Sequence, residues 1–213
     1  HQILEQMVAQ YGDTLVPIGI HANWFAQTGN PPFDYDFRTE AGETMYTDFG
    51  ITSNPAAIIN RESNPPLAKE MWQSSVAACN HDKIAAIQII NKYDHDYQFL
   101  TVYTRTTMLR NYTEKVQLSL LLVEDNIIKP QQHGSLIDTF YVHNHILRQG
   151  INGTYGEIIS PNGFVQKDSS YLYGYVLDFE STDWKPENCS VVAILWDQTN
   201  RKVLQVEKAK VIQ

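Results

Sequence analysis

Seven segments in the second part of the chain alternate between apolar and polar side chains, and this period of two constrains the fold more than any other feature. They cover residues 84–91, 97–106, 116–124, 140–148, 171–179, 191–196 and 203–211. The longest gap between them, residues 125–138, contains Pro130 and Gly134 and is expected to be a surface loop. Seven or eight short strands over this length predict an antiparallel, immunoglobulin-like β-sandwich.

The preceding residues have a different pattern, in which helical and extended segments follow one another. Residues 1–10 place four apolar side chains at helical spacing, and residues 39–46 predict a second, short helix. Between these helices, residues 14–21 form an apolar, β-branched run in which Pro17 indicates an edge strand or a bulge. Residues 22–38 are expected to form a loop, because they are rich in Asn, Gly, Pro and aromatic residues.

A proline separates the second helix from residues 56–59, which are small or β-branched and apolar, as in a buried strand. We expect the Asn54–Pro55 peptide bond to be cis, and the alternative is an ordinary trans proline that opens a strand. The order of helix, strand, loop, helix, proline and strand resembles the later part of a thioredoxin-like fold, whose first strand would lie upstream of residue 1. Residues 67–79 predict a helix where that fold has a further strand, which is therefore absent or too short to recognise.

Together these patterns predict an α+β protein with two domains. Residues 1–80 would form a truncated thioredoxin-like α/β domain, and residues 81–213 the β-sandwich. With 24 acidic and 16 basic residues, a net charge of −8 and no basic run, the chain is not expected to bind nucleic acid, because that needs clustered Lys and Arg. No run of 18 apolar residues is present, so no membrane-spanning helix is predicted.

The residues that could support catalysis form no complete set. The two cysteines, Cys79 and Cys189, do not form a Cys-x-x-Cys pair, and we expect two buried free thiols. An exported protein could instead join them in a disulfide worth about 4–5 kcal/mol in the chain-entropy model. The sequence contains no Ser-His-Asp spacing, nucleophile elbow or phosphate-binding loop, so we predict no catalytic residue and no cofactor.

The densest polar cluster lies in residues 141–148. His143 and His145 are two residues apart, so on a strand their side chains would share one face, and His21 or Glu124 could complete a metal site. The alternative, which we favour, is that these imidazoles bind backbone groups or contact the neighbouring domain. The sequence therefore predicts an interface or site cluster without a metal, and this cluster also includes Arg148.

Several short motifs resemble the twenty-eight-kilodalton outer-membrane protein family of the Bacteroidetes. They lie at residues 15–21, 49–51 with Pro55, 59–61, 122–125, 141–148 and 203–207, of which His143-Asn-His-Ile-Leu-Arg148 is the most specific. The resemblance implies an envelope lipoprotein with a thioredoxin-like front and a β-sandwich behind it. It also implies a signal peptide, a lipid-attached cysteine as the membrane anchor, and a Cys-x-x-Cys-Pro-like element, all upstream of residue 1.

Two functions of different classes are compatible with these observations. The first is a non-enzymatic protein of the cell envelope, at the outer membrane or cell surface, that binds another protein or a glycan through its loops and aromatic surface. The second is a thiol–disulfide redox module whose reactive cysteine pair lies upstream of residue 1. We favour the first, because the chain shows no complete catalytic set. A metal-dependent activity around His143 and His145 is a third, less favoured hypothesis.

Overall fold

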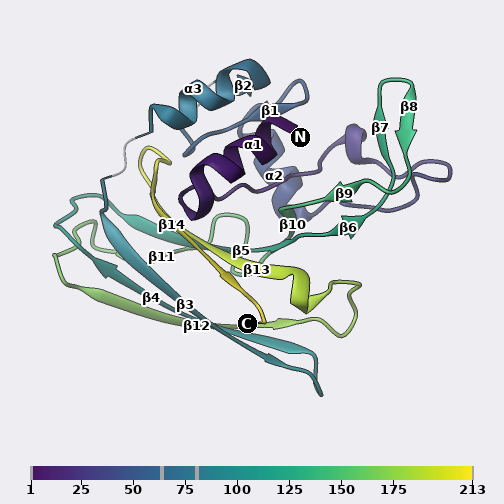
Figure 1. The fold of residues 1–213 in the computed structure, drawn as a ribbon. Coiled ribbons are helices and arrows are strands. Elements are labelled where there is room, and N and C mark those ends of the chain that lie inside the picture. The colour runs from purple at the N-terminus through teal and green to yellow at the C-terminus, as the bar shows by residue number, and fades with distance from the viewer. Residues whose placement is uncertain (1, 63–64, 80–81, 213) are drawn as a thin grey trace.

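The computed structural model describes residues 2–62, 65–79 and 82–212. These residues form three layers (Figure 1). The helices α1 (Gln2–Tyr11), α2 (Glu40–Asp48) and α3 (Trp72–Ala77) lie on one side of an antiparallel sheet, and a second antiparallel sheet lies on its other side. The protein is therefore mostly β-sheet with a few helices, as the expected α+β class requires.

The middle layer, here called the central sheet, has the strand order β10–β5–β13–β14, and β11 also pairs with β5. Its strands are β5 (Val116–Glu124), β10 (Ile146–Gly150), β11 (Glu157–Ile158), β13 (Cys189–Asp197) and β14 (Val203–Lys210). The remaining layer, here called the outer sheet, has the order β12–β4–β3. Its strands are β3 (Ala85–Asp94), β4 (Phe99–Met108) and β12 (Ser170–Asp178). Six of the seven strands that the period of two predicted are thus confirmed, whereas the one predicted at residues 140–148 is divided into β9 (Val142–His143) and β10.

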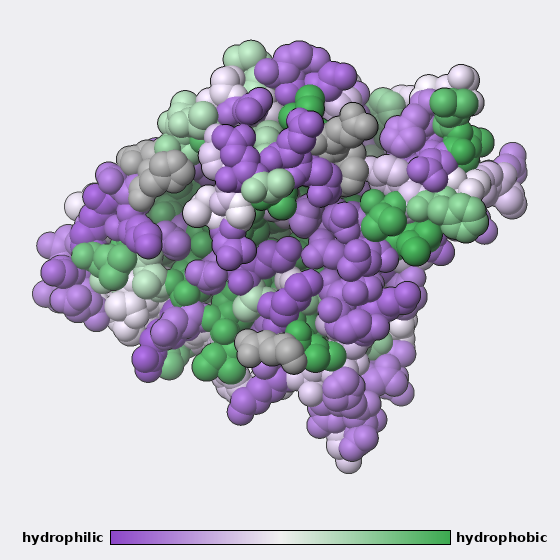
Figure 2. Space-filling model, in the orientation of Figure 1, coloured by the Kyte–Doolittle hydropathy of each residue, from purple (hydrophilic) through white to green (hydrophobic). Residues whose placement is uncertain are grey.

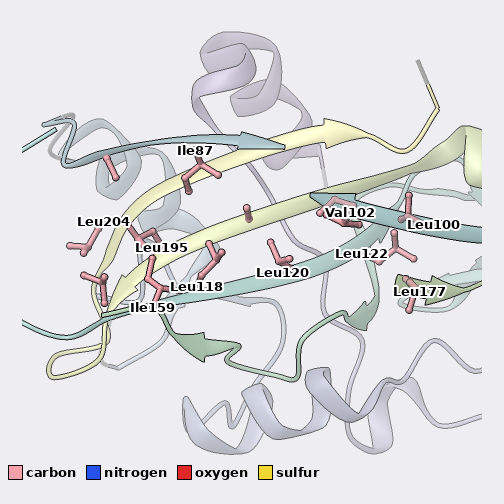
Figure 3. Packing of buried hydrophobic residues seen from close by; sticks show 14 of the residues in the cluster. Ile87, Leu100, Val102, Leu118, Leu120, Leu122, Ile159, Leu177, Leu195 and Leu204 are labelled. Carbon is pink, nitrogen blue, oxygen red and sulfur yellow. The ribbon is translucent and has the colours of Figure 1, made fainter. Parts of the chain in front are cut away.

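Both faces of the central sheet are covered, which explains why β5 and β13 are buried at every residue. Leu118, Leu120 and Leu122 of β5 point into the core shared with the outer sheet (Figure 3). The alternate residues Leu121 and Val123 point the other way, into a second core. The sequence of β5 is accordingly a nearly continuous apolar run and not a strict alternation.

The helix α2 covers this second face of the central sheet. Its Ala41 and Met45 pack with Leu121, Leu147 and Trp196, among others. The helix begins where Thr39 Oγ1 accepts a hydrogen bond from the Gly42 backbone at 3.0 Å, the usual function of a Thr N-cap. It ends before Gly50, whose φ of +62° closes the last turn. The two predicted N-terminal helices are therefore confirmed, with ends at Tyr11 and Asp48.

The prediction of a strand at residues 14–21 is wrong. This segment makes only one parallel bridge, between Gly19 and Ile146 of β10, through Gly19 N to His145 O at 2.6 Å and Leu147 N to Gly19 O at 2.9 Å. Pro17 has no N–H to donate to a longer ladder. The segment consequently runs beside the central sheet without forming a strand of its own.

The strand expected after Pro55 is also wrong in length and position. The Asn54–Pro55 bond is cis, as expected, and so is Pro31–Pro32. However, β1 (Ala56–Ala57) pairs only with β2 (Leu67–Ala68), in a separate two-stranded sheet. The positive φ values of Asn60 and Arg61, 50° and 58°, leave the extended region and stop the strand.

The helix predicted at residues 67–79 is shorter than expected. Those residues form β2, the 3₁₀ helix η3 (Lys69–Met71) and α3. Further antiparallel pairing after β1 therefore exists, but it is only two residues long. The domain boundary predicted at Asn80 falls on residues 80–81, which lie outside the described residues, and the division into two domains stays a prediction.

The expected surface loop at residues 125–138 is wrong in part, because it contains short strands. They are β6 (Ile127–Ile128), β7 (Gln131–His133) and β8 (Leu136–Asp138). Strand β6 pairs with β9 (Val142–His143), and β7 pairs with β8 as a hairpin that projects from the molecule (Figure 1). Among the described residues, no helix is long and apolar enough to cross a membrane.

Candidate functional site

An open groove is formed by the loop that precedes α2. It encloses about 550 Å³ and lies between the 3₁₀ helix η2 (Trp24–Ala26) and the first turn of α2. We call it the Trp24 groove, and it is lined by Asn23, Trp24, Gln27, Asp36, Arg38, Thr39, Glu40 and Glu43. One large aromatic side chain and several hydrogen-bonding groups therefore share a single concave surface.

One wall of the groove is held in place by Asn23. Its side chain accepts a hydrogen bond from Trp24 N at 2.6 Å, and its own N–H donates to Glu43 Oε1 of α2 at 2.8 Å. Trp24 stacks on Phe25 with ring centroids 3.8 Å apart, yet it remains 65% exposed. These hydrogen bonds hold the backbone at Asn23 and Trp24, from which the indole ring extends into solvent.

The lining of the groove also contains an ion pair. Arg38 donates to Asp36 from Nε at 2.9 Å and from Nη2 at 2.6 Å, which is the bidentate geometry of a strong charge-assisted pair. The hydrogen bonds from Arg38 lower the pKa of the Asp36 carboxyl. Both side chains remain partly exposed, at 34% for Arg38 and 43% for Asp36. The pair is therefore charged at neutral pH and accessible from the groove.

The segment that carries this pair has two faces. Asp36 and Arg38 point outward, whereas the alternate residues Tyr35 and Phe37 are half-buried, as expected of extended backbone. Phe37 stacks on His21 at 4.8 Å and lies 4.7 Å from the His143 ring. The back of the groove segment therefore packs against two histidines that the sequence analysis singled out.

His21 and His143 lie together, with ring centroids 5.6 Å apart. Burial, and then the neighbouring His143, lower the pKa of His21 to about 4. Burial also lowers the pKa of His143, whose Nε2 lies 3.2 Å from Lys129 O. Both imidazoles are consequently neutral at pH 7, and His143 contacts a backbone carbonyl, as the favoured reading expected.

His145 lies apart from His143, so the expected shared face is wrong. Strand β9 ends at His143, and the φ of 62° at His145 breaks the alternation. His145 instead contacts Asp125, with its backbone N at 2.7 Å and its Nδ1 at 3.0 Å from Oδ1. Lys208 and Lys210 also approach this carboxylate, each at 3.6 Å from Oδ2.

These contacts determine the ionisation of Asp125. Burial alone would raise the pKa of its carboxyl, but the contacts with His145 and the charge of Lys208 outweigh burial and hold this pKa well below its usual range. Among the described residues, no group of three or more His, Cys, Asp and Glu side chains is placed to hold a metal ion. Glu124, which could have completed such a site, pairs with Arg148.

Arg148 connects residues 35–38, which line the Trp24 groove in part, to the central sheet. Its Nη2 donates to Tyr35 OH at 2.8 Å and to Asp183 Oδ1 at 2.6 Å, and Tyr35 OH donates to Asp183 Oδ2 at 2.6 Å. Its Nε lies 3.4 Å from Glu124 Oε2, and the Arg148 side chain is only 8% exposed. Burial and the hydrogen bond to Asp183 raise the pKa of Tyr35 to about 12.

The structure thus divides the predicted cluster into three parts. His21 and His143 lie behind the groove, Arg148 lies in the Tyr35–Asp183 network, and His145 lies beside Asp125. Pro55 lines none of these sites. Sequence reasoning missed Trp24 and the Asp36–Arg38 pair. The available signal was the Tyr-Asp-Phe-Arg alternation at residues 35–38 within the aromatic-rich loop.

Exposed apolar side chains also gather on the projecting β7–β8 hairpin and beside it, and Figure 2 shows them over the hairpin at the upper right. Leu136 is 73% exposed, and Phe140, which follows the hairpin, is 81% exposed. Side chains this exposed contribute little to folding, since burial is what stabilises. The hairpin is therefore a second accessible surface, separate from the residues that line the Trp24 groove.

Comparison with known proteins gives a family match over most of the chain. The profile of the outer membrane protein Omp28 family matches residues 42–213. A search of curated proteins gave no match. A domain of the outer membrane lipoprotein Omp28 from Porphyromonas gingivalis is 24% identical, over 61% of this chain and 88% of that chain, with a TM-score of 0.42.

Chicken MD-1 in complex with lipid IVa is 14% identical, over 61% of this chain and 81% of that chain, with a TM-score of 0.27. These structural similarities are too low to support an argument, whereas the family match includes most of α2 and the strands of both sheets. The resemblance and the localisation that the motifs predicted are confirmed. The chain belongs to the Omp28 outer membrane protein family and is a protein of the outer membrane or cell envelope.

Proposed function

We propose that this protein is a non-enzymatic binding protein of the envelope and that the Trp24 groove binds a neutral saccharide. The observation that carries the proposal is that an exposed indole and a bidentate Asp36–Arg38 pair line one open groove. Most groove residues precede residue 42, where the family match begins, so the proposal rests on their geometry and not on the family.

A saccharide fits the chemistry of this lining. The C–H groups of a pyranose ring give it an apolar face that can lie on the indole of Trp24, while its hydroxyls bind charged side chains at the rim. Asp36 and Glu43 supply acceptors, and Arg38 supplies donors. Because each of these three side chains already makes a hydrogen bond within the groove, little conformational entropy is lost on binding.

The charge of the groove favours a neutral sugar over an acidic one. Three carboxylates, those of Asp36, Glu40 and Glu43, line it together with the single guanidinium of Arg38. The whole chain carries a net charge of −8, which also repels anionic ligands. We therefore expect neutral hexose oligosaccharides to bind and uronic acid or sialic acid oligomers not to bind.

A glycan array followed by isothermal titration calorimetry tests this proposal. We expect Trp24→Ala to weaken binding of the best neutral oligosaccharide by about tenfold or more, since aromatic anchors dominate binding sites. Tyr97→Ala is the matched control, because Tyr97 is an equally exposed aromatic residue, at 71%, in the β3–β4 turn. No binding by neutral glycans, or equal binding by Trp24→Ala and Tyr97→Ala, would reject the groove as a saccharide site.

The redox alternative depends on a cysteine pair upstream of residue 1, because the two cysteines within the chain are unsuited to exchange. Both are free thiols. Burial is the main cause that raises the pKa of Cys79 and of Cys189, so each thiol is held in its unreactive protonated form. An insulin-reduction assay on a longer form that includes the upstream residues would distinguish the alternatives, since saccharide binding needs no thiol.

A further inference from the structure

The open edge of the outer sheet is unusually unprotected. Strand β12 pairs with β4 over all nine of its residues without a register shift, and no described strand pairs with its other side. Exposed edges are normally shielded by Lys, Pro or bulges, because their unpaired backbone groups can bind another strand. The sequence of β12, SYLYGYVLD, contains none of these protecting features.

The surface of the outer sheet that faces solvent is apolar near this edge. Leu172 and Val176 of β12 are each 66% exposed. Tyr103 of β4 lies beside Gly174, with ring carbons 3.5 Å from where a Cβ would stand, and Ile90 of β3 follows in the same cross-strand row. Tyr103 is 47% exposed and Ile90 is 58% exposed. An apolar stripe therefore runs across the outer sheet to its open edge.

The hydrogen-bonding direction of β12 follows from one contact at its end. Phe179 N donates to Gln98 O at 2.9 Å, in register with the β12–β4 ladder. Because residues in an antiparallel strand direct their backbone groups alternately to the two sides, the odd-numbered residues of β12 face β4. The even-numbered residues, from Ser170 to Asp178, consequently direct their N–H and C=O groups to the open edge, and Gly174 is the middle one.

We propose that β12 pairs antiparallel with β12 of a second copy of this chain, around a twofold axis at Gly174. In this register Gly174 faces Gly174 of the second copy, and both direct their backbone groups across the axis. Leu172 then faces Val176 of the second copy, and the reverse pair forms on the other side. The two outer sheets become one continuous six-stranded sheet, in which the β12 edge of each copy is paired.

The side chains of β12 are self-complementary in this register. The facing pairs are Leu172 with Val176, and Tyr173 with Tyr175, which match apolar with apolar and aromatic with aromatic. Asp178 is the charged residue of the strand and faces Ser170, so no like charges oppose each other. Shifting the register by two residues would instead place Leu172 opposite Gly174 and lose these pairs. The complementarity of charge and shape thus favours a second copy as the partner.

A charge-swap pair of variants tests both the dimer and its register. Leu172→Lys with Val176→Lys places a lysine opposite a lysine on both sides of the axis, and we expect dimerisation to weaken on the order of tenfold or more. Leu172→Lys with Val176→Glu places a lysine opposite a glutamate, and we expect the dimer to persist. Sedimentation velocity over a concentration series, at physiological ionic strength, gives the dissociation constant of each form.

The control for the outer sheet as a whole is Ile90→Lys. This variant adds the same charge to the apolar stripe, on β3 and away from the open edge, and should leave the dimer intact. Circular dichroism melting of each variant checks that its fold is retained. A monomeric wild-type protein at all concentrations, or equal weakening by the Lys–Lys and Lys–Glu variants, would overturn the proposal.

Discussion

Arg148 and Tyr35 are 113 residues apart in the sequence and are joined by a hydrogen bond of 2.8 Å. Asp183 binds both of them, so three distant parts of the chain meet at one point. The guanidinium also lies 3.4 Å from the buried carboxylate of Glu124, on which burial raises the pKa. This network links the loop that forms the Trp24 groove to the central sheet.

Removal of the Arg148 charge should therefore destabilise the whole protein. We expect Arg148→Met to lower the free energy of unfolding by about 3 kcal/mol, because Glu124 is left buried without its cation. Arg110→Met is the matched control, since its pair with Asp82 is 3.8 Å long and exposed, and we expect a loss below about 0.5 kcal/mol. Urea denaturation measures both, and equal losses would contradict the structural importance of the network.

The histidines behind the groove should make stability depend on pH. The pKa of His21 is about 4 in the folded state, against an ordinary value of 6.5 in the unfolded state, so the unfolded state binds more protons between these values. Stability is then fully present above pH 6.5 and is lost as the pH falls towards 4, by roughly 3 kcal/mol from this group. The lowered pKa of His143 acts in the same direction.

Denaturation at pH 7, 5.5 and 4 would show this dependence, and His21→Gln should reduce the slope. An unchanged slope in that variant would assign the acid sensitivity to other groups.

Asp125 should contribute in a lower pH range. Its pKa is held below the usual value in the folded state, so its contribution is present above about pH 4 and is lost as the pH falls further. We expect Asp125→Asn to lower stability at pH 7 by about 2 kcal/mol, since Lys208 and the backbone N–H of His145 lose a charged partner. The variant should also show less acid dependence below pH 4, and a slope equal to that of the wild type would be the contrary result.

Two adjacent leucines of β5 should be equally important although they point in opposite directions. Leu120 lies in the core shared with the outer sheet, and Leu121 in the core beneath α2. We expect Leu120→Ala and Leu121→Ala each to cost about 2–5 kcal/mol, because both leave cavities in packed interiors. Leu136→Ala, at an exposed position of the β7–β8 hairpin, should cost less than about 0.5 kcal/mol. A negligible effect of Leu121→Ala would mean that α2 does not cover the sheet in solution.

Thiol reactivity tests whether Cys79 and Cys189 are buried in solution. Cys189 is fully buried and Cys79 is half-buried, and burial raises the pKa of both thiols. We expect Ellman's reagent to react slowly with Cys79 and hardly at all with Cys189 in the native protein, and with both in denaturant. Rapid reaction of Cys189 without denaturant would indicate that the first residues of β13 become accessible to solvent.

Most strands of both sheets could be predicted from the sequence because side-chain alternation records burial directly, although β11 was not predicted and β10 was merged with β9. Strand β5 has the bounds that the pattern predicted, Val116–Glu124. Its continuous apolar run also carried the information that both faces are covered, but periodicity does not say by what. The N-terminal strands were not predictable, since Pro17 and the positive φ values of Asn60 and Arg61 interrupt extended segments that propensity alone would continue.

The candidate site was predictable only in part. The sequence analysis grouped His21 with His143 as residues that could share one site, and their ring centroids lie 5.6 Å apart in the structure. His145 was misplaced because a single left-handed residue turned it to another neighbour, Asp125. Trp24 and Arg38 are brought together by tertiary contacts of a loop, which no local pattern encodes. The thioredoxin-like and immunoglobulin-like assignments stay predictions.

The cover that α2 provides has a consequence for dissecting this protein. A fragment that starts at Lys83 would contain every strand of both sheets, yet it would lay bare Leu121, Leu147 and Ile194 on one side. We therefore expect a fragment that begins where the strands begin to aggregate, because this apolar face would be exposed to solvent. The family match begins at residue 42, within this same helix. A shortened form of the protein should therefore retain α2, which covers this face of the central sheet.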